Sequence, residues 1–407
     1  MLILAALLKT MALLNYIIWN PDKTIFRIGD FHVRWYGLFI LLAFLGGRKV
    51  IRYTYQKENK PLKEADNFST WVICAALLGA RLGEIFFYDS SYYFNHPIEA
   101  FLPITFNPHF RFTGYSGLSY HGAVIGSLLG TYLYANYHME YQAFPWRWKL
   151  KKANRQGQHF LWLSTPLALA MMMGFLVRIG NFVNSEITGT PTHSLYGVLF
   201  AGNVTERLQR SSKAITQVKI HKTNTHVPHQ ACQPIVLKIT FKNGSLKEEV
   251  IRNFLEKHTK NYLIADKLIS KYVHESPEKP LNYALSKTRR NAYIATIETM
   301  GIPRHPVQLY ESIAYVITLI IHLYWWRQRH KTLKDGFIAG SAMITCYSLR
   351  FIGEFFKEPF NVLFDGFTTL TMGHLLSLIT VLGGVLLLIY SHIYHTYTRR
   401  GSSPITS

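Results

Sequence analysis

Arg178, Asn181 and Asn184 place a cation and two amides in one largely apolar stretch, and the carboxylate of Glu186 follows them. The first three residues recur at a spacing of three, so on a helix they lie along one face. Ionisable groups inside membrane segments are costly and are functional candidates by default. The alternative is that Arg178 extends to the membrane surface and that the amides only end the helix. The segment 177–189 is therefore the first candidate for a polar site.

Further polar residues occur near the ends of other apolar segments. These residues are Tyr36, Arg81, His121, Gln308, Arg350 and Glu354. Arg350 and Glu354 are four apart, and we expect them to pair because an unpaired charge there would be costly. The convergence of several segments on polar residues predicts a shared polar cavity.

The residue types indicate the chemistry of that cavity. The guanidinium groups of Arg178, Arg350 and Arg81 are planar, always charged and suited to a phosphodiester. His121 has the only side chain of this set with an unperturbed pKa near neutrality, so it is the candidate for moving a proton. It could equally be a structural hydrogen bonder within the membrane.

Four other residues have supporting roles in this interpretation. They orient a polar headgroup or hold the arginines, and they are Tyr36, Asn181, Gln308 and Glu186.

The elements that must position these residues are apolar helices. The chain has 407 residues, of which 49% are hydrophobic and 16% charged, and this composition is typical of a polytopic membrane protein. Each span needs about 20 residues. We expect an all-α membrane protein with about seven spans, at 31–47, 69–88, 118–137, 160–177, 307–326, 336–356 and 372–394.

The basic residues indicate the orientation of those spans. The net charge is +21, and Lys and Arg are concentrated in short loops after the first, third and fifth spans, which favours anionic lipid over nucleic acid as the partner. Positive loops stay inside, so we expect an outside N-terminus and a cytoplasmic C-terminus. The polar site then lies in the outer half of the membrane.

The domain organisation follows from the same pattern. We expect an N-terminal interfacial or periplasmic segment at 1–30, spans one to four within 31–188, a basic periplasmic head module with an insertion at 189–304, spans five to seven within 305–394, and a cytoplasmic tail at 395–407. In the head module, 234–242 alternates like a strand and 246–272 has helical periodicity. These patterns predict a small α+β module.

The sequence contains no pattern for a metal or a nucleotide cofactor. The three cysteines, Cys74, Cys232 and Cys346, are far apart and have no metal-ligand spacing. No Walker-type loop, dinucleotide fingerprint or nucleophile elbow occurs. The glycines at 122, 126 and 130 are spaced for close helix packing and need not contact a ligand.

At these residues the chain resembles the prolipoprotein diacylglyceryl transferase family. The family signature Gly-Arg-x-Gly-Asn-Phe-x-Asn-x-Glu-x-x-Gly is matched from Arg178 to Gly189, with Val177 in place of the first glycine. Other elements resemble the family in the same order: 35–37 (Trp-Tyr-Gly), 120–122 (Tyr-His-Gly), 305–311 (His-Pro-x-Gln-Leu-Tyr-Glu) and 350–356. The resemblance covers most of 31–394.

The resemblance implies transfer of the diacylglyceryl group of phosphatidylglycerol to the lipobox cysteine of a prolipoprotein, with release of glycerol phosphate. It implies a bacterial inner-membrane protein with seven helices and an outside N-terminus. Its partners would be phosphatidylglycerol and prolipoprotein signal peptides with a lipobox cysteine, without a cofactor. His121, Arg178 and Arg350 would be catalytic, and Gly189 would join the substrate-binding residues.

Two departures and two alternatives accompany this resemblance. Val177 replaces a usual glycine, and Thr190 stands where many members have a basic residue. A small-molecule transporter or channel also has buried arginines, but it would have inverted repeats and polar residues through the full membrane depth. A noncatalytic lipid-binding protein would have little reason to retain His121 and Glu186.

Overall fold

The computed structural model describes residues 16–401 except 29–30, 88, 103, 106–109, 113–117, 143–146, 154–156, 195, 224–231, 243–246, 289–291 and 360–369. The chain forms two compact units, each described by itself below. The first, which we call the head unit, comprises 1–38, 178–310 and 355–359. The second, the helical unit, comprises 39–177, 311–354 and 360–407. Most of the N-terminal segment expected at 1–30 lies outside the described residues.

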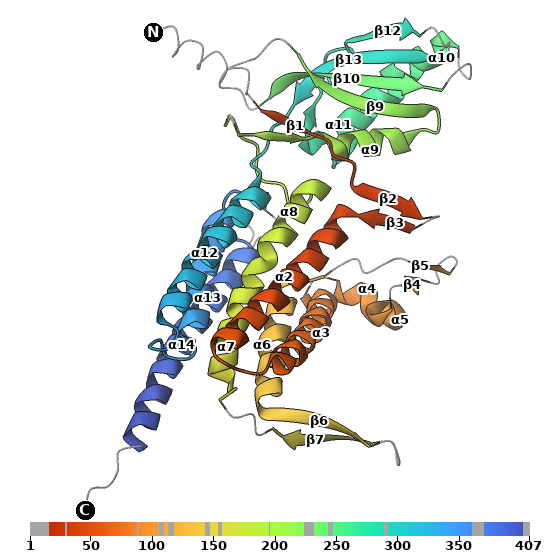
Figure 1. Ribbon diagram of the computed structural model, residues 1–407. Coiled ribbons are helices and arrows are strands. Elements are labelled where there is room, and N and C mark those ends of the chain that lie inside the picture. Colours follow the sequence, from red (N-terminus) through yellow and green to blue (C-terminus); the bar gives the residue numbers. More distant parts are fainter. Residues whose placement is uncertain are drawn as a thin grey trace, which may run out of the picture. The chain divides into compact units, whose positions relative to one another are not determined.

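Long helices dominate the chain (Figure 1). They are α2 (Trp35–Lys57), α3 (Leu62–Phe87), α6 (Tyr120–Asn136), α7 (Phe160–Met171), α8 (Phe175–Asn184), α12 (Val307–Arg329), α13 (Phe337–Glu354) and α14 (Met372–Gly401). A short 3-10 turn, Met172–Gly174, joins α7 to α8. Two short helices, α4 (Ser90–Asn95) and α5 (Pro97–Phe101), follow α3.

Four helices of the described residues are long and apolar enough to cross a membrane. They are Leu62–Phe86, Phe160–Asn184, Val307–Arg329 and Met372–Tyr397. The other three expected spans are helical over most of their length, but the one expected at 31–47 begins as the strand Phe31–Arg34. Helix α6 has only 17 residues, and α13 carries Arg350 and Glu354 within its 18. Helix α2 carries Arg48 and Arg52, which pair with Asp66 of α3. The chain is thus a mostly helical, multi-pass membrane protein, and seven spans stay a prediction.

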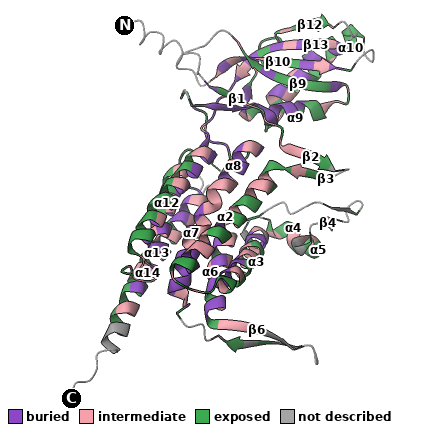
Figure 2. Ribbon diagram, viewed as in Figure 1, coloured by how far each residue is buried: buried purple, intermediate pink, exposed green. Residues whose placement is uncertain are grey.

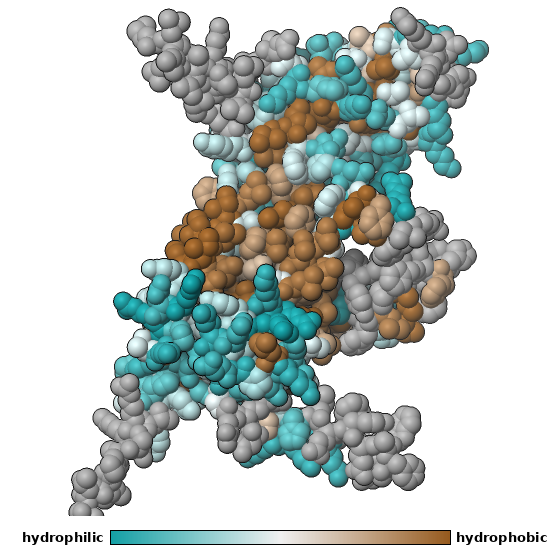
Figure 3. All heavy atoms as spheres, viewed as in Figure 1, coloured by the Kyte–Doolittle hydropathy of each residue, from teal (hydrophilic) through white to brown (hydrophobic). Residues whose placement is uncertain are grey.

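The outer surfaces of the helical unit are apolar, as lipid contact requires. Leu78 of α3, Leu129 of α6, Ile320 of α12 and Leu386 of α14 are each more than half exposed. Figure 2 shows many exposed residues on α12 and α14, and Figure 3 shows a hydrophobic band over the helices with hydrophilic residues at one end of the unit. Such a large exposed apolar surface is typical of a protein that sits in a bilayer.

Glycines allow α3 and α6 to pack closely. A Cβ on Gly83 would lie 2.8 Å from the Cα of Gly122, and a Cβ on Gly126 would lie 2.8 Å from the Cα of Gly79. Side chains at these positions would separate the helices, and small residues are the usual solution in membranes. The packing role predicted for the glycines of α6 is confirmed.

The head unit is built around a curled antiparallel sheet. Its strands are β9 (Ile215–Lys222), β10 (Gln233–Phe241), β11 (Val273–His274), β12 (Tyr283–Lys287) and β13 (Tyr293–Gly301). The order is β11-β13-β10-β9, and β12 also pairs with β13. Leu237 lies opposite both Ile220 and Ile297, and all three are buried.

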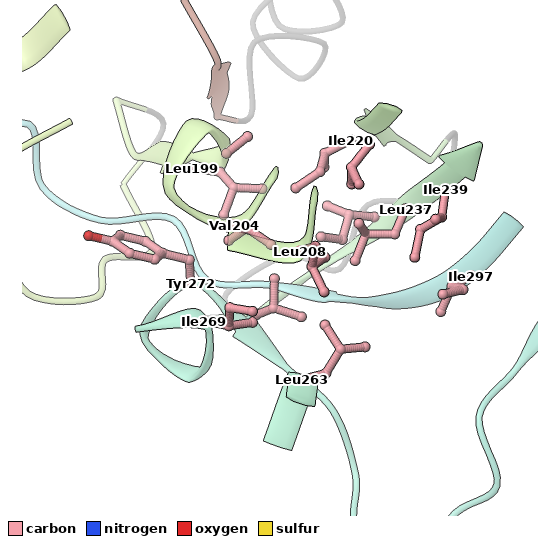
Figure 4. Close-up of a cluster of buried hydrophobic side chains, with 14 of the residues drawn as sticks. Leu199, Val204, Leu208, Ile220, Leu237, Ile239, Leu263, Ile269, Tyr272 and Ile297 are labelled. Atoms are coloured by element: carbon pink, nitrogen blue, oxygen red, sulfur yellow. The ribbon is translucent and has the colours of Figure 1, made fainter. Parts of the chain in front are cut away.

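Helices cover the apolar face of this sheet. They are α9 (Ala201–Ser211), α10 (Glu248–Asn253), the π-helix Phe254–Thr259 and α11 (Lys260–Ala265). Leu208 and Leu263 pack with the strand residues in one hydrophobic cluster (Figure 4). The strand expected at 234–242 and the helical character of 246–272 are therefore confirmed as β10 and as the helices from 248 to 265.

Four smaller strand pairs occur among the described residues. In the head unit, β1 (Ile17–Trp19) pairs in parallel with β8 (Val198–Phe200), and β2 (Thr24–Ile28) pairs with β3 (Phe31–Arg34). In the helical unit, β4 (Ile104–Thr105) pairs with β5 (Arg111–Phe112), and β6 (Tyr137–Gln142) pairs with β7 (Arg147–Lys152).

Candidate active site

The predicted site residues fall into two groups, one in each compact unit. The head unit contains Tyr36, Arg178, Asn181, Glu186, Gly189 and Gln308, whereas the helical unit contains Arg81, His121, Arg350 and Glu354. Within each unit the structure shows which of these residues lie together. We therefore describe the two groups in turn.

The polar face predicted for 178–184 is present on α8. Arg178, Asn181 and Asn184 are 6%, 5% and 7% exposed, although α8 is an otherwise apolar helix. The Nη1 of Arg178 lies 3.5 Å from the amide oxygen of Asn181. The amides of Asn181 and Asn184 each donate to one oxygen of the Glu186 carboxylate, at 3.2 Å. The buried cation and amides are thus connected in one network to the carboxylate of Glu186, which is exposed.

The loop after α8 has a strained backbone. Ser185 and Ile187 have φ angles of 58° and 55°, which residues other than glycine rarely adopt. Such residues cost about 1–3 kcal/mol each and persist only where the surroundings enforce them. The side chain of Asn203 donates to the Ser185 carbonyl at 3.0 Å, and that of Gln308 donates to the Glu186 carbonyl. These contacts hold the Glu186 carboxylate next to the amides of Asn181 and Asn184.

Gly189 lies where three backbone segments meet. Its N–H donates to the His305 carbonyl at 3.0 Å, and the next residue, Thr190, donates to the Phe356 carbonyl at 2.9 Å. A Cβ on Gly189 would lie 2.6 Å from the first oxygen and 2.7 Å from the second. Only glycine allows this close approach. The structure therefore gives Gly189 a steric reason for being glycine, besides the substrate-binding role that the resemblance implies.

Arg304 was not singled out from the sequence, yet it fastens the same loop. It is 4% exposed, and its Nη1 donates to the Gly189 carbonyl at 2.7 Å while its Nε donates to the Lys271 carbonyl at 2.9 Å. Its guanidinium also lies 3.7 Å from the Glu358 carboxylate. No local pattern distinguishes this arginine from the other basic residues of the head, so the sequence offered no signal for it.

Tyr36 and His305 complete the set of site residues in the head unit. The Tyr36 side chain lies close to Asn181 and within electrostatic range of Arg178 and Glu186. The Nδ1 of His305 lies 3.2 Å from the Tyr310 hydroxyl, and burial lowers the pKa of the imidazole below its usual value. His305 is therefore more readily neutral than a solvated histidine.

Arg350 in the helical unit has a carboxylate partner on another helix. Its Nη1 lies 3.3 Å from Oε1 of Glu311, and both side chains are at most 8% exposed. Glu354 lies within electrostatic range of Arg350, while its Oε1 accepts a hydrogen bond from Thr371 at 3.2 Å. Arg350 thus has an ion pair with Glu311, which the sequence did not indicate, and the pairing expected with Glu354 stays a prediction.

The guanidinium of Arg350 lies next to an aromatic group at the end of an apolar cavity. It is 5.4 Å from the ring centroid of Tyr120. Tyr120, Tyr315 and Tyr347 line a cavity. The remaining lining is largely apolar and includes Leu128, Leu167, Met172 and Met343. An apolar cavity with a cation near one end suits an amphipathic ligand.

His121 is the residue after Tyr120, in the first turn of α6. The Ser119 side chain caps this helix by accepting from the N–H of Gly122 at 3.1 Å. His121 is 8% exposed, and its neighbour Gly122 packs against Gly79 and Gly83 of α3. The close helix packing thus fixes the position of the histidine.

Arg81 contacts the short helices that follow α3. Its guanidinium lies 4.6 Å from the Tyr93 ring centroid and donates to the Tyr93 hydroxyl at 3.3 Å and to the Glu99 carbonyl. It is 8% exposed. These contacts fasten α4 and α5 to α3.

Among the described residues, no group of three or more histidine, cysteine or acidic side chains is arranged to hold a metal ion. The site described above is thus a set of arginines, amides, carboxylates, tyrosines and two histidines.

Comparison with known proteins gives a consistent result. The family model described as prolipoprotein diacylglyceryl transferase matches residues 23–390. A phosphatidylglycerol–prolipoprotein diacylglyceryl transferase of Tolumonas auensis is 25% identical over 92% of this chain and 96% of its own length. A protein of the same name from Chloroherpeton thalassium is 24% identical over 93% and 95%. One from Campylobacter curvus is 36% identical over 44% of this chain and 63% of its own.

Proposed function

The chain belongs to the prolipoprotein diacylglyceryl transferase family, and from this premise we propose which of its residues bind phosphatidylglycerol and which assist the reaction. Its activity is the transfer of the diacylglyceryl group of phosphatidylglycerol to a prolipoprotein. In this reaction the sulfur of the lipobox cysteine forms a bond to the glycerol carbon. The bond between that carbon and the phosphate oxygen breaks, and glycerol phosphate leaves with the electron pair.

The observation that carries the assignment is the network that links the buried side chains of Arg178 and Asn181 to the exposed carboxylate of Glu186. A buried cation that is held by an amide, while that amide is held by a carboxylate, has a fixed orientation. We propose that Arg178 and Arg350 bind the phosphate and stabilise the charge that develops on it as the carbon–oxygen bond breaks. Guanidinium groups suit this role because they present parallel donors to two phosphate oxygens.

The remaining residues of the network would orient the lipid. Tyr36, Gln308 and Glu186 would contact the glycerol headgroup or hold the arginines, and Gly189 would keep the loop close. Glu354 would contribute in the same way beside Arg350, and Arg81 would contribute through the segment that it fastens. The apolar cavity next to Tyr120 would receive an acyl chain, since its lining is largely apolar.

We propose His121 as the group that generates the thiolate. The thiolate, not the thiol, is the nucleophile, so the cysteine proton must be removed. Imidazole has an ordinary pKa near neutrality and suits this transfer. The proton leaves the substrate sulfur for the imidazole, and a proton is later returned to the solvent.

The membrane arrangement is part of the proposal. We propose seven spans in the bacterial inner membrane, with the N-terminus outside and the tail at 395–407 in the cytoplasm. The head module at 189–304 would be periplasmic, between the spans at 31–188 and those at 305–394. The basic loops support this orientation, because positive loops stay on the cytoplasmic side.

A mass assay tests the assignment. Purified protein in detergent is mixed with phosphatidylglycerol and a synthetic lipobox peptide, and the peptide mass is followed. We expect a gain of one diacylglyceryl group, and no gain for a peptide with serine in place of cysteine. His121→Ala and Arg178→Ala should abolish the gain while the protein still inserts into membranes.

Matched controls separate the site from general damage. His258→Ala and Arg252→Ala change a histidine and an arginine of the head module outside the site, and both should retain transfer. Full activity of either site variant would disprove its assignment. A folded, lipid-bound wild-type protein that gives no mass gain would disprove the proposed reaction.

A further inference from the structure

Three tyrosines from three helices lie near the guanidinium of Arg350, and the proposed reaction assigns no role to their hydroxyls. Tyr120 begins α6, Tyr315 lies on α12 and Tyr347 lies on α13 (Figure 1). The ring centroid of Tyr120 is 5.4 Å from the guanidinium carbon, and the other two tyrosines are within electrostatic range of it. Tyr315 and Tyr347 are only 4% and 6% exposed. The cation therefore lies among phenol groups, two of which are buried.

The hydroxyl of Tyr347 is buried but makes no regular hydrogen bond. Tyr120 lies close to it, yet the oxygen forms no hydrogen bond of normal geometry with any residue that the structure describes. The same is true of the Nε of Arg350, three residues further along α13. A spacing of three places both groups on one face of the helix. Buried polar groups are normally satisfied, so these two neighbouring groups indicate a place where a ligand supplies the partners.

Tyr347 also lines the apolar cavity, which extends from it along α13. Tyr347, Met343 and Ala339 all line this cavity, and each lies four residues from the next. They share one face of the helix and span about 12 Å at the 1.5 Å rise per residue of an α-helix. Leu128 of α6 and Leu167 of α7 contribute to the same lining. The cavity thus leads away from Arg350 between apolar side chains.

An acylated glycerol phosphate presents matching groups in the same order. A few covalent bonds of the glycerol separate its phosphate from each ester, and the acyl chain continues from the ester. Side chains three apart on a helix are separated by about 5–6 Å, which suits this short distance. A phenol hydroxyl can donate a hydrogen bond to a carbonyl oxygen. Arg350, Tyr347 and the cavity therefore correspond to the phosphate, the ester carbonyl and the chain.

We propose that the Tyr347 hydroxyl donates a hydrogen bond to an ester carbonyl of phosphatidylglycerol, while Arg350 contacts the phosphate and the acyl chain enters the cavity. Tyr347 is then a specificity-determining residue that favours lipids with ester-linked chains over lipids with ether-linked chains, which have no carbonyl oxygen at the linkage. The ester does not react, so both kinds of lipid can still donate their glyceryl group. This inference rests on the proposed binding of the phosphate by Arg350.

The peptide mass assay with two lipids tests this specificity. The protein receives either diacyl phosphatidylglycerol or its dialkyl analogue with ether linkages and chains of equal length, and kcat/KM for the lipid is measured. The wild type should use the diacyl lipid about three- to tenfold better, which is the contribution of one hydrogen bond. Tyr347→Phe should lower the diacyl value by that factor and leave the dialkyl value unchanged. Retained transfer from the dialkyl lipid verifies that the variant is folded.

A matched control and the contrary outcomes separate this inference from the proposed reaction. Tyr324→Phe removes the hydroxyl of an exposed tyrosine on α12 and should keep the preference for the diacyl lipid. If Tyr347→Phe loses activity equally with both lipids, the residue only packs against its neighbours and the inference is overturned. A preference unchanged by Tyr347→Phe overturns it as well, but leaves the proposed reaction intact. A wild-type protein that transfers from neither lipid disproves the proposed reaction, and this inference with it.

Infrared spectra provide a readout that does not depend on turnover. In nanodiscs of ether-linked phosphatidylcholine, added diacyl phosphatidylglycerol is the only lipid with ester carbonyls. With the wild type, the carbonyl band should contain a component at lower frequency, because a hydrogen bond weakens the carbonyl bond. Tyr347→Phe should lack this component, whereas Tyr324→Phe should retain it. Identical bands for the wild type and Tyr347→Phe would contradict the proposed hydrogen bond.

Discussion

The ion pair between Arg350 and Glu311 allows the stability of the helical unit and the transfer activity to be tested separately. The Nη1 of Arg350 lies 3.3 Å from Oε1 of Glu311, and the two side chains are 8% and 3% exposed. Glu311→Gln leaves the guanidinium buried without this partner. Breaking a buried pair in this way costs about 3–5 kcal/mol, because the remaining charge is uncompensated. At about 1.4 kcal/mol per factor of ten, the unfolding equilibrium should shift by about two to three and a half orders of magnitude.

The double variant Glu311→Leu with Arg350→Met makes the test specific. Replacing a buried ion pair with apolar residues of similar volume is often neutral or stabilising. The double variant should therefore recover much of the lost stability. It should still lose transfer, by about 10²–10³-fold, if Arg350 stabilises charge on the leaving phosphate.

Stability is measured by SDS titration in mixed micelles, and activity by the peptide mass assay. Glu248→Gln, which breaks an exposed ion pair with Arg252 in the head unit, is the control and should shift neither measurement. The reasoning is refuted if Glu311→Gln unfolds at the same SDS mole fraction as the wild type. It is equally refuted if the double variant transfers at the wild-type rate.

Three further results are expected. Gly189→Ala should reduce transfer and loosen the loop in limited proteolysis, since the new Cβ would lie 2.6 Å from the His305 carbonyl oxygen; Gly37→Ala, with open space around it, should change neither. Arg304→Lys keeps the charge but loses the two-directional fork that reaches two carbonyls, so hydrogen exchange of the Gly189 loop should rise and transfer should fall; unchanged exchange would contradict this fastening role. Leu237→Ala should destabilise the head sheet by about 2–5 kcal/mol, seen as faster hydrogen exchange in β10 but not in the helices, because the side chain is fully buried.

Local spacing was enough to predict one part of the site. Arg178, Asn181 and Asn184 lie on one face of α8, as a spacing of three on a helix requires, and all three are buried. The strand at 234–242 in the head unit could also be predicted, because the alternation of apolar and polar residues along a strand depends on neighbouring residues only.

The membrane spans could be predicted only in part from the sequence. Four helices meet the length and apolarity of a membrane segment, but α6 and α13 are short, and α13 carries buried charge. Hydropathy is calculated from the residues of one segment alone, whereas buried polar side chains form hydrogen bonds and ion pairs with residues on other helices. A segment such as α13 is therefore ambiguous until its partners are known.

The sequence alone revealed the family through the resemblance of its ordered motifs. It also indicated the helices and the basic loops, because periodicity and charge bias are properties of residues close in the chain. Which groups satisfy one another was decided only by tertiary packing. Glu311, 39 residues from Arg350, supplies its ion pair, and Arg304 reaches the carbonyl of Gly189, 115 residues away. The partner of a buried charge is the group that the packed helices and loops bring within about 3 Å. Because that group can be far away in the sequence, no local pattern predicts it.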